Sequence, residues 1–481
     1  MAGEVASVGD LGGGAREGAA RLTDRLTQAR ARLEPWAGNA PVRPLDEILR
    51  ARGLGERCNV DGGRARSLVA AGVGEGMRTM EWVSRVADHR LSSLEVENFR
   101  SLRQVTLPLG PVNVLVGPNG AGKTNVLEVF RFLADIVHTD LVPALDQRGG
   151  FERLVFHGGA VPAEYLRIGI RGAWSQPEGG QDEYDLRITG LPLAREETFR
   201  SRTRTITVLG RSATSRILYS SGPADLSGGS GDVDEIGIQP SSSGLSTLPR
   251  LSDEKFGPVT AQVAGLIRGF RIFDVDVRAA ARPTPAPLRS GEGIANDASN
   301  LSTFLLWLSA NEPDVWQRLQ ADAVEVLPQL EAIEFDHVRL AGQPTVLGML
   351  RERGLREPTP LSDASYGTTR LLGLLAMLHD PHPPALTCVE EIDHGLHPQA
   401  LELLVERVRE AGEKTQFVIA THSPSLADRL KPEELIVCER RDDGSSLIPA
   451  ISRSMVENIV RASEGLPLGE LWFSGALGGD L

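Results

Sequence analysis

The sequence predicts an α/β fold in which a phosphate-binding loop joins a buried strand to a helix. Three observations support this prediction: the glycine-rich run GPNGAGKT at residues 117–124, the apolar run LTCV that ends in Glu390 and Glu391, and the apolar run TQFVIAT that ends before His422. Each run places polar residues where a short buried strand ends. This is the edge at which open α/β sheets bind their ligands.

Composition and charge exclude several classes of protein. The chain has 481 residues, of which 41% are apolar, and a formal net charge of −13, which argues against a surface coated with basic residues for nucleic acid. No apolar run approaches the roughly 20 residues of a membrane helix, and the N-terminus lacks the features of a secretory signal. Cys58, Cys388 and Cys438 are far apart and read as reduced thiols, the last two in the core. We therefore expect a cytoplasmic protein with no membrane segment.

The chain divides near residue 90. Residues 1–90 are rich in Ala, Gly and Arg and are predicted to be a variable, partly disordered extension with a short amphipathic helix at 22–33. Alternatively, Met77 or Met80 is the true start. Residues 91–481 are predicted to form one domain. Within it, a β-rich insertion is expected at about 163–257, including a flexible loop at 219–247, and a helical lobe at about 258–380. The segment with the two acids and His422 follows at 381–430, and C-terminal strands and a tail follow at 431–481.

The elements of this domain follow from the apolar pattern. LSSLEVENF and RQVTLPL alternate like the two strands of a hairpin, and PVNVLVG is typical of a buried strand that ends in glycine. A helix is predicted from about Lys123, with Val126, Phe130, Leu133 and Val137 on one face. ASNLSTFLLWLSA predicts another helix, and three strand–helix units are expected after Ser365.

The run at 117–124 fits G-x-x-x-x-G-K-[ST] without mismatch. Glycines let successive backbone N–H groups turn toward a phosphate, and the following helix presents its positive end. Only four of the 51 basic residues are lysines, so Lys123 suggests a point charge for the β- and γ-phosphates where a planar guanidinium would fit poorly. The hydroxyl of Thr124 suits Mg²⁺. The residues predicted to bind ATP here are Asn119, Gly120, Ala121, Gly122, Lys123, Thr124 and Asn125.

The adjacent acids gain an explanation if the loop binds a nucleotide with Mg²⁺. We expect their strand to lie beside the loop strand in the same sheet, with its end beneath the phosphates. Adjacent strand residues point to opposite faces, so Glu390 would hold Mg²⁺ together with Thr124, while Glu391 would orient or deprotonate the attacking water. An alternative is a direct metal site built from Glu390, Asp393, His394 and His397.

Two further elements carry candidate site residues. His422 follows a buried strand at 415–421 and is predicted to hydrogen-bond the γ-phosphate or the attacking water. Ser365 and Gly367 precede an apolar helix that is predicted to begin near Thr368, which makes a helix N-terminus with a free hydroxyl. By itself, this second feature also fits a capped core helix.

In this order, the motifs resemble those of the ABC-type ATPase heads of the RecF, SMC and OLD group, over roughly Leu91 to Leu481. LEVENFRSL is similar to the opening strand of these heads, GPNGAGKTN to their Walker A loop, SYGTTRLL to their degenerate signature, VEEIDHGLHP to their Walker B segment and THSP to their switch histidine. The resemblance implies a P-loop NTPase fold with a β-rich lobe around a mixed sheet and a helical signature lobe. Neither a TOPRIM nuclease domain nor a coiled-coil arm is expected.

The resemblance also implies a mechanism. Two copies of such heads sandwich two ATPs, so that Ser365 and Gly367 of one protomer meet the γ-phosphate held by the other, and Asp393 lies in the loop at the interface. Gln147 is a candidate for the glutamine that senses the γ-phosphate. The implied function is an ATPase that forms a homodimer around ATP and regulates a protein effector encoded nearby, in DNA maintenance or phage defence.

Two other functions remain open from the sequence. One is a DNA-binding repair ATPase like RecF, for which Arg200, Arg202 and Arg204 would form a basic ridge along one strand. The other is a pseudo-ATPase that binds nucleotide without hydrolysing it. The complete set of Lys123, Thr124, the two acids and His422 argues against the pseudo-ATPase.

Overall fold

The structure is a computed structural model that describes residues 90–478, except 176–180, 191, 202–203, 211–214, 222–231, 237, 240, 252–255, 286–292, 341 and 464. Nearly all of the described residues belong to one of two units of the chain. The other unit, residues 1–84 with 474–476, lies almost wholly outside the described part, so the first unit alone is considered below. The helix predicted at 22–33, Met77, Met80 and Cys58 are also outside the described residues.

A five-stranded parallel sheet positions the candidate site. Its strand order is β10 (Phe270–Phe273), β15 (Leu386–Glu390), β16 (Gln416–Thr421), β3 (Val112–Val116) and β17 (Leu435–Val437). The strands β3, β15 and β16 are the three apolar runs identified in the sequence. However, β16 pairs with both β15 and β3, so the expectation that β15 lies beside β3 is wrong. The apolar pattern of the sequence identifies each buried strand, but the order of strands in the sheet is set by the long crossover connections between them.

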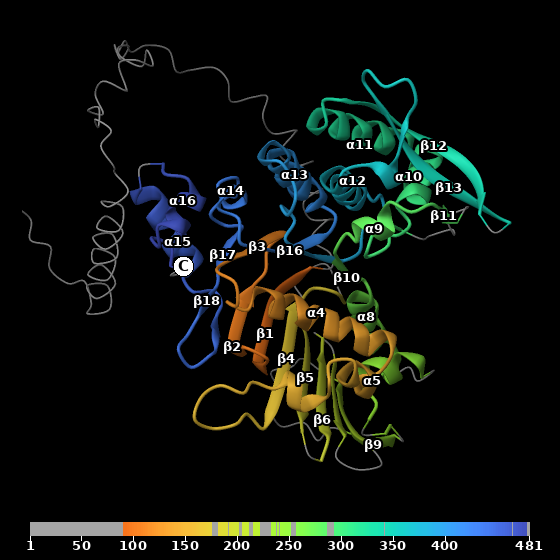
Figure 1. Cartoon of the computed structure of the whole chain (residues 1–481). Coiled ribbons are helices and arrows are strands. Elements are labelled where there is room, and N and C mark those ends of the chain that lie inside the picture. The colour runs from red at the N-terminus through yellow and green to blue at the C-terminus, as the bar shows by residue number, and fades with distance from the viewer. Residues whose placement is uncertain are drawn as a thin grey trace, which may run out of the picture. The chain divides into compact units, whose positions relative to one another are not determined.

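Both faces of this sheet are covered by helices (Figure 1). On one face, Leu115 and Cys388 join the core built around α4 (Lys123–His138). On the other, Val114 and Ile419 meet Leu404 of α13 (Pro398–Ala411), and α14 (Pro424–Ala427) adds to the same side. Strands buried on two faces are apolar throughout, which explains their continuous apolar runs. Cys388 and Cys438 are fully buried free thiols, as predicted, and burial raises the pKa of Cys438 to about 12.

Helix α4 lies between the parallel sheet and a second sheet. Its Phe130 makes an edge-on contact with Phe270 of β10, with ring centroids 5.6 Å apart. Its Phe132 contacts Phe99 of β1 (Leu91–Phe99) at 6.0 Å. The helix after the glycine-rich loop is therefore apolar around most of its circumference, because it is buried from both sides.

The second sheet is antiparallel and forms the β-rich lobe. Its order is β2 (Leu102–Pro108), β1, β4 (Tyr165–Gly172), β5 (Asp182–Thr189), β6 (Ala194–Arg200), β7 (Arg204–Gly210), β8 (Ser215–Ser221) and β9 (Asp232–Ile236). The predicted hairpin of β1 and β2 is confirmed. Of the loop predicted at 219–247, residues 222–231, 237 and 240 lie outside the described residues, and the described part contains the end of β8, β9 and the short helix α7 (Gly244–Thr247). Backbone pairing with β8 forms β9 without the apolar alternation on which the loop prediction depended.

The lobe predicted to be helical contains α8 (Gly257–Arg268), α9 (Val277–Ala280), α10 (Leu301–Asn311), α11 (Pro313–Val326) and α12 (Tyr366–Leu378). The helix predicted from ASNLSTFLLWLSA is α10. The lobe also holds a long hairpin of β12 (Leu330–Leu340) and β13 (Gln343–Glu352), flanked by β11 (Thr284–Pro285) and β14 (Thr359–Pro360), which the helical prediction did not include. Ile333 and Leu350 are buried on this hairpin, so tertiary packing stabilises strands that a short, mixed pattern did not reveal.

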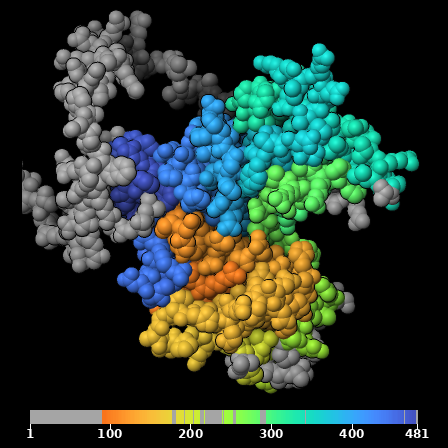
Figure 2. Space-filling view, viewed as in Figure 1, coloured from red at the N-terminus to blue at the C-terminus, as the bar shows by residue number. Residues whose placement is uncertain are grey.

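The remaining elements are short. They are α5 (Leu141–Asp146), α6 (Phe151–Leu154), a hairpin of β18 (Glu439–Arg440) and β19 (Ser446–Leu447), α15 (Arg453–Ala462) and α16 (Leu468–Phe473). Helix α8 packs against α4, and the space-filling view shows the green and amber surfaces of this part of the chain side by side (Figure 2). Among the described residues, no helix is both long and apolar enough to cross a membrane.

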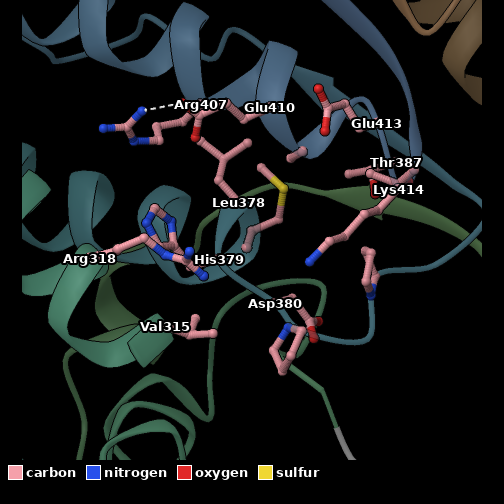
Figure 3. Close-up of a pocket in the computed structure, with 15 residues that line it drawn as sticks. Val315, Arg318, Leu378, His379, Asp380, Thr387, Arg407, Glu410, Glu413 and Lys414 are labelled. Atoms are coloured by element: carbon pink, nitrogen blue, oxygen red, sulfur yellow. Dashed lines mark hydrogen bonds and ion pairs between the residues drawn. The ribbon is translucent and has the colours of Figure 1, made fainter. Parts of the chain in front are cut away.

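Asp322 links two helices of the lobe, α11 and α12, to α13 outside it. Its carboxylate, on α11, accepts hydrogen bonds from Nε and Nη2 of Arg407 on α13, at 2.6 and 2.8 Å. The second partner is Nε2 of His379, which follows α12, at 3.0 Å. Beside this link, a cavity of about 300 Å³ lies at the C-terminal ends of α12 and α13, and the amino group of Lys414 points into it (Figure 3). The N-termini of the same two helices lie near the candidate site described below.

Because of this link, we expect the free energy of unfolding to decrease at acid pH. Burial by itself would raise the pKa of Asp322, but the hydrogen bonds and charges of His379 and Arg407 lower it from 3.8 to about 2. A depressed carboxyl pKa stabilises the fold above the unfolded-state pKa, and this stabilisation is lost as the pH falls through the folded-state value. We expect Asp322→Asn to cost about 2 kcal/mol at pH 7, and about half of this difference to disappear by pH 3.

Urea unfolding at pH 7, 4 and 3 measures the difference. The matched control is Glu325→Gln, which removes an exposed carboxylate from the same helix and should change stability by at most about 0.5 kcal/mol. An equal loss at all three pH values, or equal behaviour of the two variants, would rule out the link as the source of the effect.

Candidate nucleotide-binding site

The glycine-rich loop connects β3 to α4, as the sequence predicts. Gly120 and Gly122 have φ values of 82° and 101°, in the left-handed region that favours glycine. A Cβ atom at Gly122 would collide with the hydroxyl of Ser446, and one at Gly117 would collide with the carbonyl oxygen of Cys438. The glycines are therefore required by backbone conformation and by the close approach of the chain after β17.

Lys123 is held against its own loop. Its Nζ donates to the carbonyl oxygens of Gly117, at 2.7 Å, and of Pro118, at 3.0 Å. The residue is only 9% exposed, and burial lowers its pKa, against the opposing effect of Glu391 and Glu390. An ammonium group has three donors, so one N–H remains available for a phosphate oxygen.

A cavity of about 200 Å³ opens above the loop. Its lining brings together eight predicted site residues and two that were not predicted: Asn119, Gly120, Gly122, Lys123, Thr124, Asn125, Glu390 and Glu391, with Ala420 and Arg440. Ala121 is buried in the loop itself. His422, Ser365, Gly367 and Gln147 do not line this cavity. Residues from four distant segments of the sequence thus converge on the carboxyl edge of the parallel sheet.

Thr124 and Glu390 are in direct contact. The Thr124 hydroxyl, in the first turn of α4, donates a hydrogen bond to Oε1 of Glu390, although β16 lies between β15, which carries Glu390, and β3, which leads into α4. Hydroxyl and carboxylate oxygens are hard donors of the kind that Mg²⁺ prefers, usually with water and phosphate completing its shell. The pair therefore fits a magnesium ion.

Glu391 does not continue β15. Its φ of 49° lies in the left-handed region, and its N–H donates to the carbonyl oxygen of Ala420 at 2.8 Å. The argument from alternating strand faces is therefore wrong for this residue, because the chain turns there. The turn separates the two carboxylates: that of Glu391 lies 3.4 Å from Nδ1 of His422 and 3.9 Å from Nδ1 of His394.

Arg370 supports the backbone of both acids and was not predicted as a site residue. Its side chain is 3% exposed, and Nη2 donates to the carbonyl oxygens of Glu391, at 2.8 Å, and of Glu390, at 3.4 Å. It lies on α12, one turn after Ser365, within the SYGTTR run. Its position in that motif was the available signal, but its role depends on the packing of α12 against the turn.

The signature residues lie at the start of α12. Ser365 caps this helix by accepting the Thr368 N–H at 3.1 Å, so the helix begins at Tyr366 and not near Thr368 as predicted. Ser365 is exposed. At Gly367, a Cβ atom would lie 2.7 Å from the carbonyl oxygen of Gly395, so the turn that follows the acids contacts the first turn of α12.

The alternative of a direct metal site is not supported by the geometry. Asp393 accepts a hydrogen bond from the Thr421 hydroxyl at 2.7 Å, and His397 caps α13 through Nδ1. Within residues 90–478, as far as they are described, no group of three or more His, Cys, Asp or Glu side chains is arranged to hold a metal ion. His394 lies beside the carboxylate of Glu391, as His422 does, and the two histidines are not part of a metal site.

The predicted basic ridge is not a set of free cations. Arg200 donates to Glu183 at 2.8 Å, Arg202 is outside the described residues, and Arg204 takes part in an interaction of its own. Positive charge along β6 and β7 is therefore already engaged where the structure describes it.

Comparison with known families locates ATPase models on two parts of the chain. Residues 90–144 match the family "AAA ATPase domain", and residues 250–428 match "AAA domain, putative AbiEii toxin, Type IV TA system". The first match covers β1 to α4 with the glycine-rich loop, and the second covers the helical lobe, both acids and His422. The antiparallel strands from β4 to β9 lie between the two matches.

Curated relatives match over short segments. An OLD nuclease from Thermus scotoductus is 49% identical over 55 residues, which is 11% of this chain and 10% of that protein. A DNA replication and repair protein RecF from Acidothermus cellulolyticus is 49% identical over 70 residues, 14% of this chain and 19% of that protein. The matches therefore span about a tenth and a fifth of the lengths of these relatives.

Solved structures of SMC heads also overlap with this chain. One is the SmcHead bound to the C-winged helix domain of ScpA, with a TM-score of 0.47, 15% identity and coverage of 75% of this chain and 96% of that chain. Another is the Smc head domain with an extended coiled coil, bound to the C-terminal domain of ScpA, from Pyrococcus furiosus, with a TM-score of 0.46, 14% identity and coverage of 78% and 99%.

The family matches and the short identities to RecF and OLD proteins agree with the strand–loop–helix geometry at Lys123. An ATPase domain of this kind implies nucleotide binding and, in general, a divalent metal. Residues 90–144 and 250–428 of the chain thus match ATPase domains, and short segments of it are similar to RecF and OLD proteins.

Proposed function

We propose that this protein binds ATP with Mg²⁺ and hydrolyses it, and that it acts in the cytoplasm as a switch on a partner protein. The observation that carries the proposal is the convergence on one cavity of Lys123, the Thr124–Glu390 pair and Glu391. Lys123 and the loop N–H groups would bind the phosphates. Thr124 and Glu390 would hold Mg²⁺, which supplies positive charge against the phosphate oxygens.

Glu391 is proposed as the general base. Its carboxylate takes a proton from water as the water oxygen attacks the γ-phosphorus, and the bond from that phosphorus to the bridging oxygen breaks to give ADP and inorganic phosphate. His422, 3.4 Å from this carboxylate, would orient the water or the γ-phosphate. Arg370 acts as a positioning residue, since it fixes the backbone of both acids.

The proposed active form is a homodimer closed around ATP. Ser365 and Gly367 are separated from the cavity of their own chain, and Ser365 is an exposed helix cap with its hydroxyl near solvent. This arrangement leaves them free to meet a γ-phosphate bound by a second copy. A partner effector encoded nearby is supported by the toxin–antitoxin description of the family matched at 250–428.

The test combines hydrolysis with a measurement of mass. Purified full-length protein is expected to release phosphate from ATP in the presence of Mg²⁺, and to shift from monomer to dimer with a slowly hydrolysed ATP analogue in gel filtration with light scattering. Absence of any ATP binding or hydrolysis would overturn the proposed function, whereas hydrolysis by a permanent monomer would overturn only the dimer.

A second candidate function is a DNA-binding ATPase, favoured by the 49% identity to a RecF over 70 residues. It predicts that DNA stimulates hydrolysis and that the stimulation falls steeply as salt rises. The engaged arginine of the predicted ridge and the net charge of −13 favour the protein effector instead.

A further inference from the structure

The hairpin of β18 and β19 forms one wall of the phosphate loop. The Ser446 hydroxyl lies where a Cβ atom of Gly122 would stand, and it is 2.7 Å from the hydroxyl of Ser101. The carbonyl oxygen of Cys438 would likewise collide with a Cβ atom at Gly117. The hairpin is therefore packed against the loop at Ser446, and the chain leading into it is packed against the loop at Cys438, so residues between them have a defined position relative to the loop.

Arg440 of β18 reaches from this wall to the tip of the loop. Its Nη1 donates to the carbonyl oxygen of Gly120 at 3.1 Å, and its side chain lines the cavity together with Lys123 and the two acids. A Cβ atom on Gly120 would meet nothing within 4 Å, so the loop tip is open on that side. The guanidinium therefore stands at the rim of an accessible space.

Arg440 differs from the other arginines near the loop. Arg100 lies 3.6 Å from the carboxylate of Glu128, and Arg103 lies 2.9 Å from that of Asp443. Arg440 has no carboxylate partner within the described part of the chain, and its contact with Gly120 uses one N–H of five. Most of its hydrogen-bonding capacity is thus available to a ligand.

The charge of the cavity lining indicates which ligand. Two carboxylates, Glu390 and Glu391, face two cations, Lys123 and Arg440. A nucleoside triphosphate remains negative after it binds one Mg²⁺, so it adds negative charge to a lining that is otherwise balanced. Without Arg440, Lys123 would face both acids and the polyphosphate alone. A guanidinium also matches two phosphate oxygens at once, which an ammonium group does not.

We infer that Arg440 is a second phosphate-binding cation of this site, which contacts a non-bridging oxygen of the bound nucleotide while it holds Gly120. The inference rests on the proposed ATP binding and deepens it. The polyphosphate would thus contact cations from two elements, Lys123 at the end of the loop and Arg440 of β18 at the rim of the cavity. Arg440 is expected to strengthen binding of ATP and ADP without taking part in proton transfer.

The test compares Arg440→Ala with Arg441→Ala. Arg441 is the next residue, is exposed and does not line the cavity, so its substitution removes the same charge from the same hairpin. Loss of a charged hydrogen bond corresponds to roughly a tenfold loss of affinity. We expect Arg440→Ala to raise the Kd of ATP and ADP and the KM of ATP about tenfold, to keep kcat within about twofold, and to leave the thermal midpoint of the nucleotide-free protein unchanged. Arg440→Lys should recover part of the affinity.

The other outcomes contradict the inference. If both alanine variants weaken nucleotide binding equally, the loss comes from the change in net charge and not from a contact of Arg440. If neither variant weakens binding, Arg440 does not contact the nucleotide. A lowered thermal midpoint with unchanged affinity would make Arg440 a structural residue. Lys123→Ala, titrated with the same nucleotides, separates these outcomes from a failure of the proposed function. If Lys123→Ala binds ATP as well as the native chain does, the phosphate site itself is refuted.

Discussion

Replacing Glu391 with glutamine is expected to stop ATP turnover while ATP binding is retained. Glutamine has the shape of glutamate but cannot accept a proton from water, and loss of a general base reduces a rate by about a hundredfold to ten-thousandfold. The side chain is 42% exposed, and its backbone is held by Ala420 and Arg370. The substitution should therefore leave the local fold unchanged. Phosphate release and ATP affinity, measured on the same preparation, test both halves of the expectation.

The same variant is expected to accumulate as a dimer with ATP, because the proposed dimer reopens only after hydrolysis. Light scattering on the gel-filtration peak measures this directly. Glu406→Gln is the control, since Glu406 is an exposed carboxylate on α13, outside the cavity lining. If Glu391→Gln turns over ATP normally, another group is the base. If it binds ATP but stays monomeric, the proposed sandwich of two subunits is refuted.

Replacing Lys123 with alanine is expected to remove nucleotide binding. The substitution deletes the cation nearest the phosphates and leaves Glu390 and Glu391 to repel them, so we expect a loss of affinity of about a hundredfold or more. Isothermal titration with ATP and ADP measures the loss. The carbonyl oxygens of Gly117 and Pro118 lose their partner as well, so the thermal midpoint of the nucleotide-free variant should be recorded alongside.

Lys431→Ala provides the matched control for Lys123→Ala. Lys431 is another of the four lysines, is exposed and lies outside the cavity lining, so its loss should change neither affinity nor turnover. Hydrolysis by Lys123→Ala at the native rate would show that the glycine-rich loop is not the site of ATP binding. Equal weakening by both lysine substitutions would point to net charge instead.

The local chemistry of the site could be predicted from the sequence, but its three-dimensional neighbours could not. Gly117 to Thr124 and the two acids each follow a buried strand, and period and composition identify such runs. The position of β16 between β15 and β3 depends on crossover connections that leave no trace in either run. The left-handed turn at Glu391 is equally hidden, because glutamate rarely adopts this conformation.

The missed residues share one property. Arg370 and Arg440 act on groups from distant parts of the chain, the carbonyl oxygens of the acids and of Gly120. In a chain with 51 basic residues, an arginine on a hairpin carries no signal of such a contact, and the place of Arg370 in the SYGTTR run did not show which groups it would contact. Only the packing of α12 and of the β18–β19 hairpin against the loop edge reveals it. The strands β12 and β13, in the lobe predicted to be helical, were missed for a similar reason.

The two hydrogen bonds from Arg370 have a thermodynamic consequence for the proposed dimer. They connect the helix that begins at Ser365 to the backbone of Glu390 and Glu391, so an arrangement of α12 favoured by a second subunit's nucleotide would also shift the acids. Linkage between two sites is reciprocal in free energy. Any factor by which occupancy of the phosphate loop tightens the association of two heads must also be the factor by which association tightens nucleotide binding. A partner protein that displaces the N-terminus of α12 would then weaken both the association of the two heads and the binding of nucleotide.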